Sequence, residues 1–231
     1  MTLVVVTGAS RGLGLALVQQ YRKRGAEVIG ACRNPAAASE LEDSGAEVQE
    51  LDTGNSESIA AFATAVGDRP VHVLFNNAGI DARAVGAGES ERGALDLTEE
   101  QFRAVLDVNT LGPWLMVKAL ADNLTAAGGV IVNVSSQVGS IEVAQNIGRD
   151  ISYTTSKAAL NMITVKESQV FRPLGVTVIS LHPGWVRSDM GGPSATLDPD
   201  VAAASIADVV DSLTLDNTGS FFQWDGSIHP W

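Results

Sequence analysis

The sequence predicts an α/β fold: a single domain in which a doubly wound parallel sheet carries helices on both faces. Short runs rich in β-branched residues alternate along the chain with longer stretches of helical periodicity, a pattern typical of parallel sheets. Several of these runs are apolar throughout, as expected of strands that are buried on both faces. The 231 residues, 45% of them hydrophobic, are enough for one large core, and no repeat or linker divides the chain. We therefore expect residues 1–231 to form one domain.

The expected elements follow one another in regular order. The expected strands are residues 3–7, 28–32, 47–51, 71–75, 130–134 and 176–181, with residues 220–222 as an added edge strand. The expected helices are residues 12–24, 56–66, 98–124, 153–171 and 199–213. Residues 80–97 and 183–198 have no clear period and form two long loops. Because each loop follows a strand of a doubly wound sheet, both are expected at the edge where ligands bind.

The composition excludes several classes of function. A net charge of −12 argues against nucleic-acid binding, which needs a basic face, and against adsorption to anionic membranes. No apolar stretch approaches the ~20 residues of a membrane span. Cys32 is the only cysteine, so no internal disulfide forms, and the three histidines, His72, His182 and His229, lack metal-ligand spacing. The sequence thus predicts a soluble, cytoplasmic protein without a bound metal.

A glycine-rich turn links the first expected strand to the first expected helix. It runs Thr-Gly-Ala-Ser-Arg-Gly-Leu-Gly at residues 7–14. Glycines permit a tight turn and close approach to a pyrophosphate, and the N-terminus of the following helix attracts phosphate. The alternative is a plain glycine-rich turn. It is less favoured because a strand precedes this turn and a helix follows it. The residues expected to contact the cofactor here are Gly8, Ser10, Arg11, Gly12, Leu13 and Gly14.

The end of the second expected strand indicates which dinucleotide binds. A site for NAD places an acid there, which accepts a hydrogen bond from the ribose 2′-hydroxyl. This chain has Cys32 and Arg33 instead, and Arg33 together with Arg11 offers charge-assisted contacts to a 2′-phosphate. The alternative is that both arginines are solvated surface residues. We expect NADP(H) as the cofactor, with Cys32 as a wall of the nucleotide site rather than a nucleophile.

Tyr153 and Lys157 are the clearest catalytic candidates. They are four residues apart on an expected helix and therefore project from one face. A free tyrosine has a pKa near ~10, and lowering it by ~3 units takes about 4 kcal/mol, which one cation at ~4 Å supplies in a partly shielded site. An isolated Tyr-x-x-x-Lys pattern is more often an amphipathic helix with a packed tyrosine and a solvated lysine. Here, however, Ser135 and Ser136 follow the fifth expected strand.

Together these motifs resemble the short-chain dehydrogenase/reductase family along nearly the whole chain. The resemblance also rests on Asn-Asn-Ala-Gly at residues 76–79 and Pro-Gly at residues 183–184. It implies a Rossmann-type fold and a catalytic set of Asn109, Ser136, Tyr153 and Lys157, with Ser135 as the alternative serine. Asn109 would position a water near the lysine. The resemblance implies further cofactor contacts from Leu51, Asp52, Asn77, Ala78, Gly79, Tyr153, Lys157, Pro183, Gly184, Val186 and Ser188.

The chain is most similar to a subgroup of the family that includes the bacterial C-factor and insect sniffer carbonyl reductases. Residues 182–193 and 225–231 carry this similarity, and so does the spacing of seventeen positions between Ser136 and Tyr153, which exceeds the usual one. The extra residues, 142–151, are expected at the mouth of the active site. The residues expected to contact substrate are Asp81, Gln137, Ile141, Ile147, Trp185 and Met190.

The resemblance implies a reversible, NADPH-dependent reduction of a ketone or aldehyde to an alcohol. Hydride transfer would be accompanied by a proton relay through the catalytic set. Two alternatives stay open: reduction of an imine on the same scaffold, and a non-catalytic, nucleotide-sensing or signalling role. The resemblance further implies a homodimer or homotetramer, assembled through residues 98–124 and 153–171.

Overall fold

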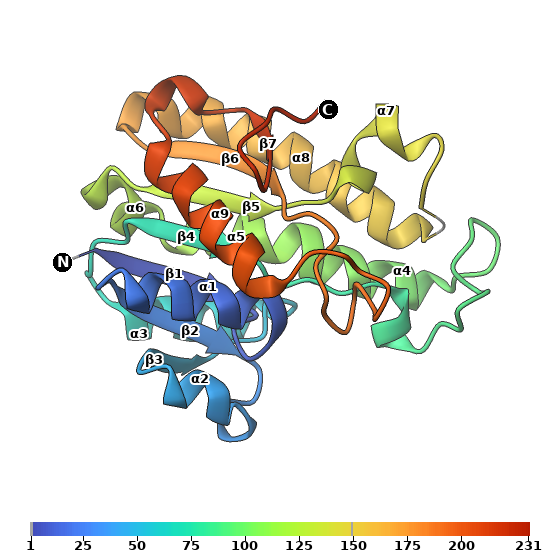
Figure 1. Ribbon diagram of the computed structural model, residues 1–231, viewed down its shortest axis with the longest axis horizontal. Helices are drawn as coiled ribbons and strands as arrows, with labels where there is room; N and C mark the ends of the chain where they lie inside the picture. The colour runs from blue at the N-terminus through green and yellow to red at the C-terminus, as the bar shows by residue number, and fades with distance from the viewer. Residues whose placement is uncertain (1, 149) are drawn as a thin grey trace.

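Seven parallel strands form one sheet in the order β3-β2-β1-β4-β5-β6-β7 (Figure 1). The computed structural model describes residues 2–148 and 150–231. The order reverses between β1 and β4, so a crevice opens at the carboxyl ends of these two strands, where doubly wound sheets bind ligands. The strands are β1 (Leu3–Thr7), β2 (Glu27–Cys32), β3 (Glu47–Glu50), β4 (Val73–Asn76), β5 (Val130–Val134), β6 (Thr177–His182) and β7 (Phe221–Gln223).

Helices cover both faces of the sheet (Figure 1). One face carries α1 (Gly12–Lys23), α2 (Ser39–Asp43) and α9 (Pro199–Ser212), and their apolar side chains form one buried cluster with the strands. A second cluster lies on the other face, beneath α3 (Ser56–Val66), α5 (Gly112–Ala119), α6 (Ala121–Ala127) and the end of α8 (Ile151–Phe171). The remaining helices, α4 (Glu99–Leu106) and α7 (Ile141–Ala144), lie toward the carboxyl edge of the sheet.

The predicted fold class is confirmed, and each predicted strand lies within two residues of its observed bounds. The prediction of a single helix over residues 98–124 is wrong. This segment is divided into α4, a π-helical segment η3 (Asp107–Leu111), α5 and α6. Pro113 has no N–H to donate to the carbonyl of Asn109 four residues earlier, so a regular α-helix cannot continue through this point. The short helices α2 and α7 have too few residues to show a period.

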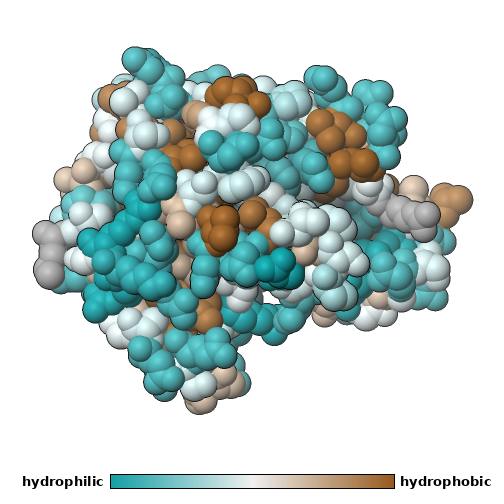
Figure 2. Space-filling model, viewed as in Figure 1, coloured by the Kyte–Doolittle hydropathy of each residue, from teal (hydrophilic) through white to brown (hydrophobic). Residues whose placement is uncertain are grey.

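The visible surface is mainly hydrophilic, and apolar side chains occur in separate small groups (Figure 2). This distribution agrees with the acidic composition. Across residues 2–148 and 150–231, none of the helices combines the length and the apolar character that a membrane span requires.

Candidate active site

The glycine turn packs against the residues that follow β4. Gly8 has a φ of +66°, in the left-handed region that favours glycine, and a Cβ there would lie 2.9 Å from Ala78 Cα. A Cβ on Gly14 would lie 2.2 Å from the Gly8 carbonyl oxygen and 2.7 Å from Asn77 Nδ2. Side chains at either position are therefore excluded, and the turn lies directly against residues 77–78.

Thr7, the last residue of β1, joins the same two segments. Its hydroxyl accepts hydrogen bonds from the N–H groups of Asn77 (3.0 Å) and Ala78 (2.9 Å). It donates to the carbonyl of Phe75 (3.3 Å). The Asn77 side chain donates in turn to the Thr7 carbonyl (2.9 Å). Predicted cofactor residues from β1 and β4 are thus held together at the crevice where the strand order reverses.

The first turn of α1 offers free donors to an anion. Its N-cap residue, Arg11, makes no side-chain capping hydrogen bond, and the turn contains no acidic side chain. The first N–H groups of an α-helix have no acceptor within the helix. Together with the helix dipole, these donors fit the pyrophosphate of a dinucleotide.

The residues predicted to select the nucleotide lie at the ends of β2 and β3. Cys32 and Leu51 are buried, whereas Asp52 is half-buried. Arg33 is exposed and makes no ion pair within residues 2–148 and 150–231. Its guanidinium is therefore available to an anionic group.

The segment after β6 lies over the glycine turn. A Cβ on Gly12 would lie 3.4 Å from Ser188 Cβ. Arg11 Nε lies 3.1 Å from Asp189 Oδ2, in an ion pair whose side chains are 73% and 75% exposed. Such an exposed pair contributes little stability, so Arg11 can exchange Asp189 for another anion at low cost. The predicted cofactor residues of the turn and of residues 183–188 thus come together.

Tyr153 and Lys157 of α8 face the end of β5. Ser136, which follows β5, lies near the Tyr153 hydroxyl and lowers the pKa of Tyr153. Lys157 Nζ donates to the Val134 carbonyl (2.8 Å) and lies 5.8 Å from the centre of the Tyr153 ring. Ser135, the alternative serine, is buried, and its hydroxyl has no hydrogen-bond partner in the described part of the chain. The geometry therefore favours Ser136 as the partner of Tyr153.

Asn109 is fully buried in η3. Its Oδ1 accepts a hydrogen bond from Ile80 N (2.8 Å), and its Nδ2 donates to the Ile80 carbonyl (2.8 Å) and to Ser156 Oγ (3.0 Å). A Cβ on Gly79 would lie 3.4 Å from Asn109 Oδ1 and 3.5 Å from Lys157 Nζ, so both polar groups face the same small space. The Asn109 side chain thus fixes the backbone after β4 to α8, next to Lys157.

Burial dominates the protonation of the tyrosine and the lysine. It raises the pKa of Tyr153 to about 12; the charges of Asp81 and Asp150 act in the same direction, whereas the Ser136 hydrogen bond lowers it. Burial also lowers the pKa of Lys157 to about 8. Lys157 is not among the groups that shift the pKa of Tyr153 in the chain by itself. At neutral pH Tyr153 holds its proton, which is the form that donates to a carbonyl oxygen.

Among the residues predicted to contact substrate, Asp81 is buried and paired with Arg83, Gln137 begins the 3-10 turn Gln137–Gly139, and Ile141 begins α7. Ile141, Ile147, Trp185 and Met190 are exposed apolar side chains. Sequence reasoning misses Asp150, which caps α8 by accepting a hydrogen bond from Tyr153 N (2.9 Å). An acid three residues before a helical tyrosine is the ordinary N-cap pattern, and it would have placed the start of the helix at residue 151.

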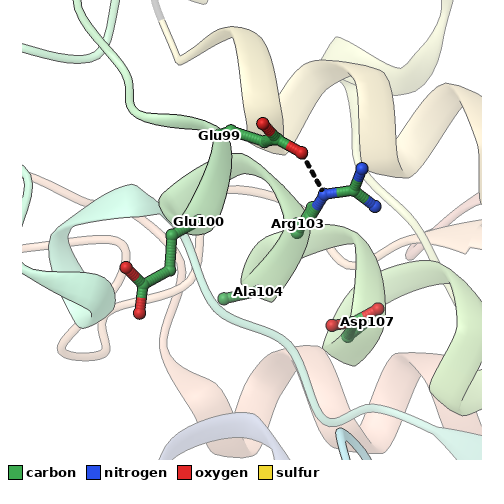
Figure 3. A pocket seen from close by; sticks show the side chains of 5 residues that line it. All are labelled: Glu99, Glu100, Arg103, Ala104 and Asp107. Atoms are coloured by element: carbon green, nitrogen blue, oxygen red, sulfur yellow. Dashed lines mark hydrogen bonds and ion pairs between the residues drawn. The ribbon is translucent and has the colours of Figure 1, made fainter.

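A separate hollow lies on α4 and contains none of the predicted site residues (Figure 3). Figure 3 draws one ion pair in this hollow, between Glu99 and Arg103 (2.8 Å), which are four residues apart on the helix. Such pairs are typical of a solvated helix face. We assign this hollow no ligand. Its lining residues are Glu99, Glu100, Arg103, Ala104 and Asp107.

Comparisons with known proteins agree with this geometry. The family model described as short chain dehydrogenase matches residues 2–197. C-signal of Myxococcus xanthus is 37% identical over 172 residues, which cover 74% of this chain and 99% of that protein. The NADPH-bound carbonyl reductase from chicken fatty liver is 30% identical, with a TM-score of 0.89 and full coverage of both chains. The carbonyl reductase Sniffer of D. melanogaster is 31% identical, with a TM-score of 0.89 and coverage of 100% and 99%.

Proposed function

Because the chain belongs to the short-chain dehydrogenase family, we propose that it reduces a ketone or aldehyde to an alcohol with NADPH, and that the reaction is reversible. The observation that carries this proposal is the convergence of Ser136, Tyr153 and Lys157 at the end of β5, where Lys157 Nζ donates to the Val134 carbonyl and lies 5.8 Å from the centre of the Tyr153 ring. The carbonyl reductases named above supply the substrate class. Residues 1–231 would act as one catalytic domain.

The cofactor of this chain is NADP(H). The pyrophosphate fits the uncapped first turn of α1, and the exposed, unpaired Arg33 fits a 2′-phosphate better than a 2′-hydroxyl. The chicken carbonyl reductase, which is described with bound NADPH, is consistent with this assignment. When bound, NADPH supplies the hydride.

The side chains handle the oxygen and the proton. Ser136 and Tyr153 donate hydrogen bonds to the substrate carbonyl oxygen, and Tyr153 then transfers its proton to that oxygen as the alcohol forms. Lys157, with a pKa of about 8, is positioned to return a proton to Tyr153 through the space beside Gly79. Asn109 keeps that space open by holding Ile80 in place.

Two observations bear on the alternatives. C-signal carries a name that denotes signalling, which favours a nucleotide-sensing role as the second candidate. A pure sensor has no chemical need for a serine and a tyrosine that lie together with a buried lysine beside them, so we place catalysis first. Imine reduction would use the same hydride and differs in the substrate atom that receives the proton.

We also propose that the chain forms a homodimer or homotetramer. Leu111 and Trp114, at the start of α5, are 44% and 43% exposed, and Met162 and Val170 of α8 are 59% and 62% exposed. Large apolar side chains exposed on neighbouring helices are typical of protein–protein interfaces. A second copy of the chain would bury them.

The test of function is a titration of the purified protein with NADPH and with NADH, followed by a panel of carbonyl compounds. We expect tighter binding of NADPH and a loss of NADPH absorbance that depends on the carbonyl compound. If the protein binds NADPH and reduces cyclic imines but no carbonyl compound, the substrate class is imines instead. Binding without any turnover would favour the sensing role.

A further inference from the structure

Asp150 joins the start of α8 to the segment that follows β4. Its Oδ1 accepts hydrogen bonds from Tyr153 N (2.9 Å) and Ser152 Oγ (2.7 Å). Its Oδ2 accepts from Ala82 N (2.9 Å). The residue is only 6% exposed. One buried carboxylate therefore connects the backbone of Tyr153 to Ala82, in the loop that begins directly after Gly79.

Further contacts bind this loop, residues 80–97, to its surroundings. Ile151 N donates to the Arg92 carbonyl (3.1 Å), so the first residue of α8 holds the loop at a second point. Arg83 pairs with Asp81 (2.6 Å) and donates to the Met190 carbonyl in the segment after β6 (2.8 Å). Figure 1 shows these segments together beyond the carboxyl edge of the sheet. The loop is thus attached to both of its neighbours around the proposed substrate entrance.

We propose that Asp150 is a positioning residue, which holds the loop of residues 80–97 against the Tyr153 end of α8 and so shapes the entrance for the carbonyl substrate. This inference rests on the proposed function. Asp150 touches neither substrate nor cofactor; it acts through Ala82 and Tyr153, whose N–H groups it binds.

The chemistry of the contact calls for a carboxylate. A helix N-cap alone is served equally well by serine, threonine or asparagine. At Asp150, however, both oxygens accept from donors, and an asparagine would turn its NH₂ group toward one of those N–H or O–H groups. A buried charge is also tolerated only where it is fully hydrogen-bonded, as three donors ensure here. The connection to Ala82, rather than the cap, explains an aspartate at this position.

The same carboxylate acts on the phenol. Its negative charge raises the pKa of Tyr153, as does that of Asp81. The other groups facing Tyr153 are Ser136 from the end of β5 and Lys157 from α8 itself. Arg83 and Arg92 are both paired with Asp81, at 2.6 and 4.0 Å. Loss of the Asp150 charge alone should therefore lower the pKa of Tyr153.

Two variants separate the connection from the charge. Asp150→Ser keeps an N-cap hydroxyl for Tyr153 N but loses both the contact with Ala82 and the charge. Ala82→Pro removes the N–H donor and leaves the carboxylate in place. Proline is tolerated at the first position of a helical turn such as Ala82–Val85, and Asp81 before it is extended (φ −111°, ψ 177°), as proline requires. Ala82→Pro also keeps the question testable if Asp150→Ser does not fold.

We expect both variants to raise hydrogen–deuterium exchange in residues 80–97 and to raise the KM for the carbonyl substrate about tenfold, as for the loss of one hydrogen bond to a charged group. The Kd for NADPH should not change. Only Asp150→Ser should move the pH profile of kcat/KM to lower pH. The matched control is Asp216→Ser, which removes an exposed carboxylate together with its contact to Arg172 (3.3 Å); it should change neither KM nor this exchange.

Exchange and KM that stay at wild-type values in both variants would overturn the proposal. So would increased exchange with an unchanged KM in an active enzyme, because the loop would then not shape the entrance. An unshifted pH profile in an active Asp150→Ser variant would contradict the action on the phenol. If the wild-type protein turns over no carbonyl compound, the proposed function fails instead, and the exchange measurement still reports whether Asp150 holds the loop.

Discussion

At the scale of single residues, the hydroxyl of Tyr153 is the group on which the proposed reaction depends most. Tyr153→Phe removes the proton donor, and we expect kcat/KM to fall by about 10²–10⁴-fold, the usual contribution of a positioned acid. The Kd for NADPH should not change. Tyr21→Phe is the matched control, since Tyr21 is the only other tyrosine and its buried hydroxyl has no partner among the described residues. Normal turnover in Tyr153→Phe, measured as NADPH oxidation, would mean that another group donates the proton.

Arg33 is the residue that we propose to select the cofactor. Arg33→Ala removes a charge-assisted contact of about 1.5–3 kcal/mol, so the Kd for NADPH should rise roughly 10- to 100-fold. Binding of NADH, which lacks the 2′-phosphate, should hardly change. Arg103→Ala removes an exposed arginine of α4 whose ion pair in the described part of the chain is with Glu99, and it should affect neither Kd. Equal losses for both nucleotides in Arg33→Ala, measured by fluorescence titration, would contradict this assignment.

At the scale of elements, α5 and α8 carry the test of assembly. Trp114→Glu places a charge among the exposed apolar side chains of these helices, and we expect a shift toward monomers because burying an unpaired charge at an interface is costly. Val201→Glu makes a comparable change on α9, at a side chain that is 54% exposed, and should leave the assembly unchanged. Sedimentation velocity at several protein concentrations measures both. A wild-type protein that is already monomeric would contradict the proposed oligomer.

Elements with a strong local signal could be predicted from the sequence, and elements formed by long-range contacts could not. β1, β5 and α3 have the predicted bounds, because continuous apolar runs and amphipathic periods determine them locally. Pro113 marks the break in the helix predicted over residues 98–124, but it does not reveal the π-helical turn at Asn109, whose side chain is held by Ile80 and Ser156, 29 and 47 positions away. The same limit applies to the site. Motifs identified Ser136, Tyr153 and Lys157, whereas the contact of Asp150 with Ala82 spans 68 positions and leaves no pattern in the sequence.

At the scale of the whole molecule, a buried acid connects stability to pH. Glu167 on α8 is 7% exposed; its Oε2 accepts from Asn133 Nδ2 (3.0 Å), and its Oε1 has no partner among the described residues. Burial raises its pKa from 4.5 to about 8, with the Asn133 hydrogen bond opposing the shift. The folded protein therefore keeps this carboxyl neutral, while the unfolded chain ionises it above pH 4.5. The contribution of Glu167 to the free energy of unfolding is complete below pH 4.5 and is lost as the pH rises through about 8.

Glu167→Gln removes this pH dependence. Over the window between the two pKa values, the free energy of unfolding of the wild type should fall relative to that of the variant by up to about 1.4 kcal/mol per pH unit. His182 also makes stability depend on pH, because burial lowers the pKa of its ring to about 4, and it therefore destabilises the folded protein as the pH falls. Both proteins contain His182, so the difference between their free energies of unfolding reports Glu167 alone. Urea unfolding at pH 5, 6, 7 and 8 (about one-unit steps across the window) measures the difference.

Glu100→Gln, an exposed change on α4, is the control and should follow the wild type. Curves for wild type and Glu167→Gln that run parallel across this range would show that the carboxyl is not held neutral in the folded protein.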